Sequence, residues 1–441
     1  MKRRTAVSAM AGLWMCTLPG APALWAQQQQ PTLSKDDQYK ISEMLRDAHD
    51  DVKKHYYDPK LQGLDWDAQY KRFSAMIPKA QDIGTGFEIV AAFLDELKDS
   101  HTYFVPPMRS TRYDYGFRFE LIGNECFVTH VRPATDAESR LRVGDQIMRV
   151  DGYNLNRDDF HKLGYFLNVL SPQVAEQLDL RSPTGEVRRV VVRSSVRPLK
   201  KIMDLTGESD GFDLVRRSED EDHATRSRLV ESGDLAIWKL RQFDLDDGEV
   251  DKFMGQARKH KTLILDLRGN PGGAEDTLKY MVGAFFDHDI KISDRVTRKK
   301  SEPLIARQHG TPFNGKLIVL VDAGSASAAE IFARVMQLEH RGTVIGDRTA
   351  GAVMEAEHYR ESRGVDVKFF YAFSVTEADL IMTDGKSLEK TGVTPDEQVL
   401  PTGADLAAGR DPMLVRAAEL GGVKLDPVEA GKMFPFEWLP L

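Results

Sequence analysis

The chain is poor in cysteine and contains no motif spaced for a metal ion. Only 2 of its 441 residues are cysteines, Cys16 and Cys126, which excludes a disulfide-stapled scaffold. No His-Glu-x-x-His motif or similar ligand set occurs, so we expect no metal and no other cofactor. Long basic runs are also missing and the formal net charge is −8, which argues against nucleic acid as a partner.

Long apolar stretches are missing too, except near the N-terminus. After residue 26 no window approaches the roughly 20 uninterrupted apolar residues of a transmembrane segment. Lys2-Arg3-Arg4 precedes an apolar stretch and small residues up to Ala26, a pattern typical of a secretory signal peptide over residues 1–26. We therefore expect a bacterial protein exported to the periplasm or outside the cell. A lipid anchor at Cys16 and a single membrane anchor are alternatives for this leader.

The rest of the composition is that of a globular protein. Hydrophobic residues make up 41% and charged residues 29%, and the length predicts about two to four domains. Apolar residues at helical spacing, such as Ile41, Leu45 and Ala48, predict an N-terminal helical domain over residues 33–110. Pro106-Pro107 stops regular structure near its end.

Short β-type runs alternate with turns over residues 113–198. The expected strands are 117–121, 126–131, 146–150 and 187–193, and the expected helix is 157–169. The segments Val131-Arg132-Pro133, Leu141-Arg142-Val143-Gly144-Asp145 and Val150-Asp151-Gly152 resemble those of a PDZ domain. This resemblance implies a β-sandwich-like domain in which Gly116, Phe117, Arg118 and Phe119 bind a peptide that adds as a strand. The alternative is that these four residues only begin the first strand.

The second half of the chain has the pattern of an α/β domain. Residues 199–230 are polar and mixed in charge, which predicts a solvated linker or hairpin. The apolar runs 263–267 and 317–321 are typical of buried parallel strands, and predicted helices lie between and after them. This alternation predicts an α/β core over residues 231–430.

Two loops follow the buried strands. The first contains Asp266-Leu267-Arg268-Gly269-Asn270-Pro271-Gly272-Gly273, whose glycines allow backbone N–H groups to approach a ligand. The second contains Asp322-Ala323-Gly324-Ser325-Ala326-Ser327-Ala328-Ala329-Glu330 and leads into a helix. A serine at such a turn lies at the positive end of the helix, where an oxyanion is stabilised. The alternative for Ser325 and Ser327 is helix capping.

Taken together, the two loops resemble the C-terminal processing and tricorn-type serine peptidase family, over roughly residues 35–430. The resemblance implies an α/β core of the crotonase/ClpP type and an endopeptidase that acts on protein or peptide substrates through an acyl-serine. It also implies that Ser327 is the nucleophile. The oxyanion would be bound by the N–H groups of Ala328 and of Gly272 or Gly273.

One position departs from the tail-specific branch of this family. That branch has a general-base lysine after the last glycine of a downstream loop, whereas Ala352 follows Gly351 here. The tricorn branch instead uses a Ser-His pair and a glutamate, and its pattern implies His101 as base, Ser100 as the group that orients it and Glu389 as the carboxylate that polarises Ser100.

Three other residues near these motifs have less specific patterns. Lys368 lies on an alternating segment and is expected to be solvated. His358 is the fallback base, and Glu330 is expected to be a first-turn helix residue without a catalytic role.

Two other functions remain open from the sequence. The first is a catalytically inactive protein of the same fold whose PDZ domain binds partners, which Ala352 favours. The second is a crotonase-like acyl-CoA enzyme, because the fold alone does not fix the function. Export argues against the second, since CoA substrates are cytosolic.

Overall fold

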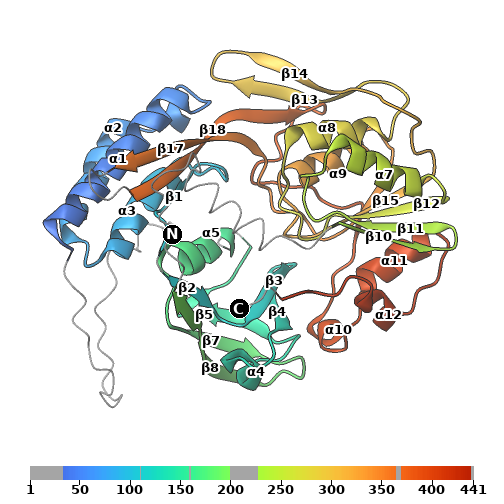
Figure 1. The fold of residues 1–441 in the computed structure, drawn as a ribbon, viewed down its shortest axis with the longest axis horizontal. Coiled ribbons are helices and arrows are strands. Elements are labelled where there is room, and N and C mark those ends of the chain that lie inside the picture. Colours follow the sequence, from blue (N-terminus) through green and yellow to red (C-terminus); the bar gives the residue numbers. More distant parts are fainter. Residues whose placement is uncertain (1–32, 110, 158–159, 199–226, 364–368, 439–441) are drawn as a thin grey trace, which may run out of the picture.

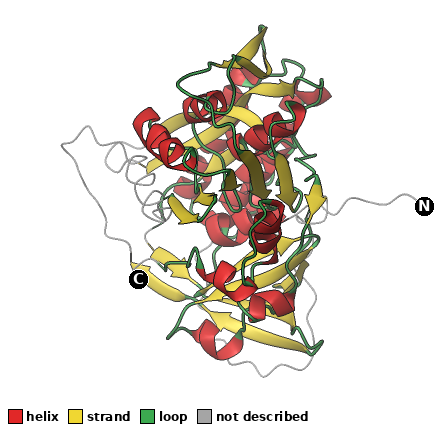
Figure 2. Ribbon diagram, turned by 90° about the vertical axis from the view of Figure 1, so that its right-hand side faces the viewer, coloured by secondary structure: helices red, strands yellow, loops and turns green. Residues whose placement is uncertain are grey.

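The computed structural model describes residues 33–438 except 110, 158–159, 199–226 and 364–368. The predicted signal peptide therefore lies outside the described residues. N-terminal helices, a β-rich domain and an α/β core follow one another along the chain (Figure 1). We call the β-rich part, residues 111–198, the middle domain; it lies at the bottom of both overall views and consists mainly of strands (Figure 2).

Three helices form the N-terminal part, as the apolar spacing predicts. They are α1 (Lys35–His55), α2 (Trp66–Ser74) and α3 (Ile83–Asp95). The Ser34 side chain caps α1 by accepting a hydrogen bond from the N–H of Asp37 (3.0 Å). Ile41, Leu45 and Ala48 are fully buried in the core of this part. None of the helices in the described ranges is long and apolar enough to cross a membrane.

The middle domain is built around one antiparallel sheet in the order β3-β4-β5-β7-β8, with β6 at its side. Its elements are β2 (Thr111–Asp114), β3 (Phe117–Ile122), β4 (Glu125–Val131), α4 (Asp136–Arg140), β5 (Gln146–Val150), β6 (Tyr153–Asn154), α5 (Phe160–Tyr165), β7 (Ala175–Arg181), β8 (Val187–Arg193) and β9 (Ser195–Pro198). The four predicted strands are confirmed. The expected helix 157–169 is shorter, because α5 passes into a π-helical segment, Phe166–Leu170.

The α/β core has a six-stranded sheet in the order β10-β11-β12-β15-β16-β19, parallel from β11 onward. Its strands are β10 (Arg228–Ser232), β11 (Leu235–Lys239), β12 (Thr262–Asp266), β15 (Lys316–Val321), β16 (Thr343–Gly346) and β19 (Glu397–Gln398). The end of the segment 199–230, predicted as a linker or hairpin, is therefore part of the sheet, where β10 pairs with β11 as a hairpin. This edge strand turns into β11 at Gly233, which has a φ of +58°, and its exposed polar residues gave it the pattern of a loop.

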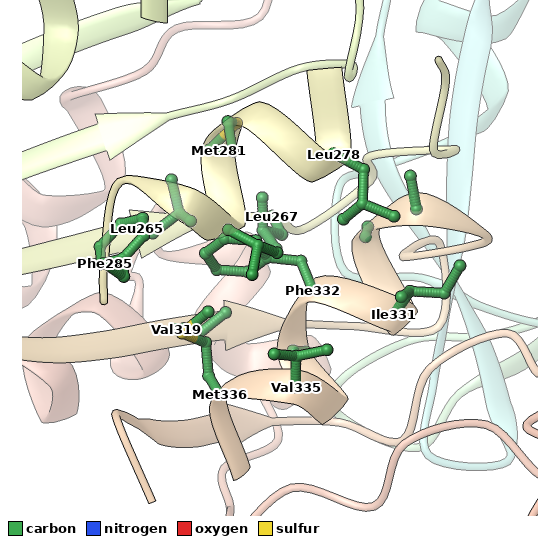
Figure 3. Packing of buried hydrophobic residues seen from close by; sticks show 14 of the residues in the cluster. Leu265, Leu267, Leu278, Met281, Phe285, Val319, Ile331, Phe332, Val335 and Met336 are labelled. Carbon is green, nitrogen blue, oxygen red and sulfur yellow. The ribbon is translucent and has the colours of Figure 1, made fainter. Parts of the chain in front are cut away.

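Helices cover both faces of this sheet (Figure 1). They are α7 (Asp247–Ala257), α8 (Glu275–Gly283) and α9 (Ala328–Leu338) on one face, and α11 (Pro412–Leu420) and α12 (Pro427–Lys432) on the other, with α10 (Gly403–Ala407) nearby. The apolar side of α9 packs Phe332 and Met336 towards Leu265 and Val319 of the central strands (Figure 3). This packing fixes the start of α9 at the end of β15.

A second sheet joins the core to the N-terminal helices (Figure 1). Its strands are β1 (Tyr103–Val105), β13 (Ile290–Thr297), β14 (Ser301–Ala306), β17 (Met354–Arg363) and β18 (Phe369–Met382). Tyr371 and Phe373 of β18 are buried among the N-terminal helices. The short strand β1 pairs with β18. This pairing positions the residues just before Tyr103 next to the core.

The middle domain contacts the core at both ends of its β3–β4 hairpin. At the turn, the Arg157 side chain donates to the carbonyls of Gly123 (2.9 Å) and Arg348 (2.8 Å) and pairs with Asp347 (2.6 Å). At the open end, Phe436 from the C-terminal segment stacks on His130 of β4, with ring centroids 4.2 Å apart. The domain is therefore held against the core at two separate points.

Candidate active site

Ser327 lies on a strained turn between β15 and α9. Its φ of 52° and ψ of −119° are unusual for a residue with a side chain. The sharp strand-to-helix turn presents the serine at the end of the strand, as nucleophile elbows do. The Ser327 side chain is half-buried, at the positive end of the α9 dipole.

The structure separates Ser327 from the other serine of the turn. Ser325 is fully buried, and its hydroxyl donates to the Leu267 carbonyl (2.8 Å) and accepts from the N–H of Asp322 (3.0 Å). Ser325 therefore fixes one loop against the other. Of the two serines, Ser327 is the one whose position suits a nucleophile.

The glycine-rich loop after β12 lies directly against Ser327. A Cβ atom on Gly272, which has a φ of +104°, would come within 2.6 Å of the Ser327 Cβ. The Asn270 side chain holds this loop, because its Oδ1 accepts from the N–H of Gly272 (2.8 Å) and its Nδ2 donates to the Leu240 carbonyl (3.0 Å). Only glycine fits at position 272, and the Gly272 N–H is already occupied.

Two other backbone donors beside Ser327 are unoccupied. Among the hydrogen bonds of the described residues, none is donated by the N–H of Gly273 or of Ala328. One follows Gly272 in the glycine loop and the other opens α9. Such a pair of fixed donors suits a developing oxyanion. Of the two glycines that the sequence left open, the geometry favours Gly273 as the donor.

Ser100, His101 and Glu389 form a hydrogen-bonded chain. Ser100 Oγ lies 2.7 Å from His101 Nδ1 and 2.8 Å from Glu389 Oε2. The Ser100 N–H also donates to Glu389 Oε1 (2.8 Å). A hydroxyl has one proton, and because the carboxylate only accepts, Ser100 Oγ donates to Glu389 and accepts from the Nδ1–H of His101. His101 Nε2 is then unprotonated and available as a base.

Burial is the main influence on the pKa values of His101 and Glu389. Burial lowers the pKa of His101, the charge of Asp99 opposes this shift and His358 adds to it. Burial raises the pKa of Glu389, while the hydrogen bonds from Ser100 lower it. His101 is therefore neutral near pH 7, which is the form a general base requires.

Two consecutive residues connect the hydrogen bonds of Ser100, His101 and Glu389 to the serine turn. The N–H of Ser327 donates to the Ala352 carbonyl (2.9 Å), and the N–H of Val353 donates to Glu389 Oε2 (3.0 Å). Within the described residues no hydrogen bond joins Ser327 Oγ to His101 Nε2. Such bonds are often long in free enzymes.

Glu330 has a more important position than the sequence indicated. Its carboxylate is fully buried and accepts from the Thr349 hydroxyl (2.5 Å) and from the N–H groups of Gly351 (2.8 Å), Ala352 (2.9 Å) and Ser327 (3.1 Å). Burial raises the pKa of Glu330 to about 7, against these hydrogen bonds. Glu330 thus holds the strained serine turn against the loop at 349–352.

The remaining predicted residues take no part in the hydrogen bonds among Ser100, His101 and Glu389. His358 is on β17, with its ring 6.1 Å from that of Tyr103, and Lys368 lies outside the described residues. In the middle domain the N–H of Gly116 donates to Asp114 (2.8 Å). Phe117 is buried, Arg118 is exposed and Phe119 is half-buried on β3. The outer edge of β3 pairs with no other strand of the described chain.

Sequence reasoning missed Asn270, Asp99 and Arg157 as residues that hold the site. Asn270 and Asp99 each stand two residues before the group they fix, the spacing of an Asx-turn, and this signal was available. Arg157 had no such signal, because its partner Asp347 is 190 residues away.

A serine on a strained strand-to-helix turn, backbone donors beside it and a histidine held by serine and glutamate are the arrangement of a serine hydrolase. Residues 234–399 match the model of peptidase family S41, and residues 37–83 match the tricorn protease C1 domain. The first match contains the serine turn and the glycine loop.

Individual relatives agree with this class. A carboxy-terminal-processing protease of Bartonella bacilliformis is 32% identical over 310 residues, covering 66% of this chain and 64% of the relative. A probable CtpA-like serine protease of Staphylococcus epidermidis is 26% identical over 42% of this chain, which spans 38% of that relative's length. The crystal structure of mature CPAF shares the fold, with a TM-score of 0.64 at 15% identity, over 84% of this chain and 94% of that one.

These findings support the C-terminal processing and tricorn-type serine peptidases as the family of this chain, and indicate a serine-type peptidase, a hydrolase. The family and enzyme class predicted from the two loops agree with these matches. The mixed α/β fold is confirmed.

Proposed function

We propose that the chain is an exported serine endopeptidase that hydrolyses peptide bonds through an acyl-enzyme at Ser327. The observation that carries the proposal is the link through Ala352 and Val353, which ties Ser327 and Glu389 to consecutive residues of one loop. Export rests on the sequence of residues 1–26 alone. A catalytically inactive binding protein would have no need of a histidine held in one tautomer.

The proposed reaction uses His101 twice. Ser327 Oγ attacks the peptide carbonyl carbon while its proton passes to His101 Nε2, and the resulting oxyanion is bound by the N–H groups of Gly273 and Ala328. The intermediate collapses as His101 gives the proton to the departing amine. Water then attacks the acyl ester, His101 accepts a proton from it and returns that proton to Ser327, and the carboxylic acid product leaves. Ser100 and Glu389 keep the His101 tautomer constant throughout.

We propose further that the middle domain is a PDZ domain that recruits or gates the substrate. The unpaired edge of β3 supports strand addition by a peptide. Arg157 supports gating, because its partner Asp347 begins the loop that holds Ser327. A peptide that shifts β3 would act on the serine turn through this contact.

A fluorophosphonate probe tests the catalytic proposal. The mature protein should be labelled at Ser327, Ser327→Ala should not be labelled and His101→Ala should react at least about 100-fold more slowly. Ser139→Ala, at an exposed serine of α4, is the matched control and should react like the wild type. A folded wild-type protein without labelling would contradict the proposal.

A further inference from the structure

The turn that carries His101 contains a carboxylate with no part in the steps above. Asp99 Oδ1 accepts three hydrogen bonds, from the N–H groups of His101 (3.0 Å) and Thr102 (2.7 Å) and from the hydroxyl of Thr376 (2.8 Å). Thr376 is fully buried in β18. Asp99 therefore fastens the backbone of His101 to the long strand that leads to Glu389.

The charge of Asp99 is not compensated by a cation. Over the described ranges no lysine, arginine or histidine forms an ion pair with it, and its Oδ2 atom is buried without a hydrogen-bond partner. The Tyr56 hydroxyl interacts with Asp99 but carries no charge, because burial and the charge of Asp99 raise its pKa. A half-buried carboxylate without a cation is less stable than one that is paired with a cation.

A positive charge appears beside Asp99 only during the reaction. When the O–H bond of Ser327 breaks, a new N–H bond forms at His101 Nε2 and the ring becomes an imidazolium. Asp99 exchanges no proton in this step. A carboxylate whose charge faces no cation in the resting protein but faces the imidazolium in the transition state lowers the barrier, because it stabilises the transition state more than the ground state.

We propose that Asp99 is a positioning residue of the peptidase reaction, which holds the backbone of His101 and stabilises its imidazolium by charge. The inference rests on the proposed function. Three ionisable groups face the imidazole or its partner Ser100: Asp99 on the same turn, His358 on β17 and Glu389 after β18. Of these, Asp99 raises the pKa of His101 and His358 lowers it.

The test removes the charge of Asp99 and keeps the conformation of its turn. Asp99→Asn preserves an oxygen acceptor for the three donors, and Asp99→Ser is a second neutral variant that also suits the turn. We expect fluorophosphonate labelling at neutral pH to slow about 10- to 100-fold in both. The acidic limb of the pH profile of the labelling rate should move to lower pH, because loss of the negative charge lowers the pKa of His101.

A second measurement does not depend on activity. In the Ser327→Ala background, an NMR titration of the His101 ring should give a lower pKa with Asp99→Asn than without it. Thr376→Val is the matched control, since it removes one hydrogen bond on Asp99 but leaves the charge, and neither the acidic limb nor the titration should move. Asp99→Glu keeps the charge and should retain the wild-type titration.

The outcomes are distinguishable. Slower labelling without a shift of the acidic limb, or an unchanged His101 titration, would reduce Asp99 to a structural residue and overturn the inference. A folded wild-type protein that is not labelled at all would overturn the proposed function instead, and the ring titration would still decide whether Asp99 acts on His101.

Discussion

The hydroxyl of Ser100 donates to the carboxylate of Glu389 over 2.8 Å, although 289 residues separate the two along the chain. One residue precedes β1 and the other follows β18, and these strands pair. The Glu389 carboxylate also accepts from Val353, next to the residue that binds Ser327. A single carboxylate thus joins the N-terminal turn to the loop that holds Ser327.

Replacement of Glu389 by glutamine should slow acylation while leaving the fold intact. The amide nitrogen cannot accept the hydrogen bonds that the carboxylate takes from Ser100 and Val353. The His101 tautomer would then be less well defined, and we expect fluorophosphonate labelling to fall about 100-fold. Glu429→Gln, at an exposed side chain of α12, is the control. Equal labelling rates for both variants would contradict the role of Glu389.

Replacement of Gly272 by alanine should strongly reduce activity and destabilise the core. The added Cβ would come within 2.6 Å of the Ser327 Cβ, and overpacking of this kind costs about 1–3 kcal/mol. Displacement of the neighbouring donor should lower the labelling rate by at least about 100-fold.

Gly269→Ala in the same loop is the matched control. Gly269 also has a positive φ, of +66°, but nothing lies within 4 Å of an added Cβ. We expect it to cost about 1 kcal/mol and to remain reactive. Loss of labelling in both variants would show that backbone strain, and not contact with Ser327, explains the result.

Replacement of Arg157 by alanine should weaken the contact between the middle domain and the core, and should make the loop at residues 346–352 more mobile. The side chains of Arg157 and Asp347 are only 10% and 2% exposed, and breaking such a pair costs about 3–5 kcal/mol. Hydrogen exchange over residues 346–352 should become faster and labelling slower. Arg189→Ala breaks the more exposed pair with Asp179 and should leave both unchanged. Unchanged exchange in Arg157→Ala would contradict the coupling.

The stability of the core should depend on pH through Glu330. Its pKa is raised from 4.5 to about 7 by burial, so the folded state binds the proton more tightly than the unfolded state. The resulting stabilisation is present below about pH 4.5 and is lost as the pH rises through 7, a decrease of about 3 kcal/mol in the free energy of unfolding.

Urea unfolding of the wild type and Glu330→Gln at pH 5 and pH 8 measures this contribution. The variant cannot ionise, so its free energy of unfolding should fall less over this range. The variant should also be less stable at pH 5, because its amide nitrogen meets backbone donors. A pH dependence equal to that of the wild type would show that Glu330 does not titrate in this range.

The local parts of the site followed from the sequence. The serine turn and the glycine loop each lie within nine residues, and their residue types select backbone geometry directly, so both were predictable. The strands that alternate with helices were predictable for the same reason, since period and apolar content are local. The polar edge strand β10 was expected only as part of a linker or hairpin, because its partner, not its own pattern, makes it a strand.

Only the tertiary structure decided how these parts meet. It assigns Ser325 to a buried link between loops, occupies the Gly272 N–H with Asn270 and surrounds the Glu330 carboxylate with four donors. It also leaves Asp99 without a cation beside His101. Hydrogen-bond partners and burial depend on residues far apart in sequence, brought together by strand pairing and helix packing. The sequence alone therefore indicated which groups are candidates for the chemistry, and the fold determined their burial, their direction and their hydrogen-bond partners.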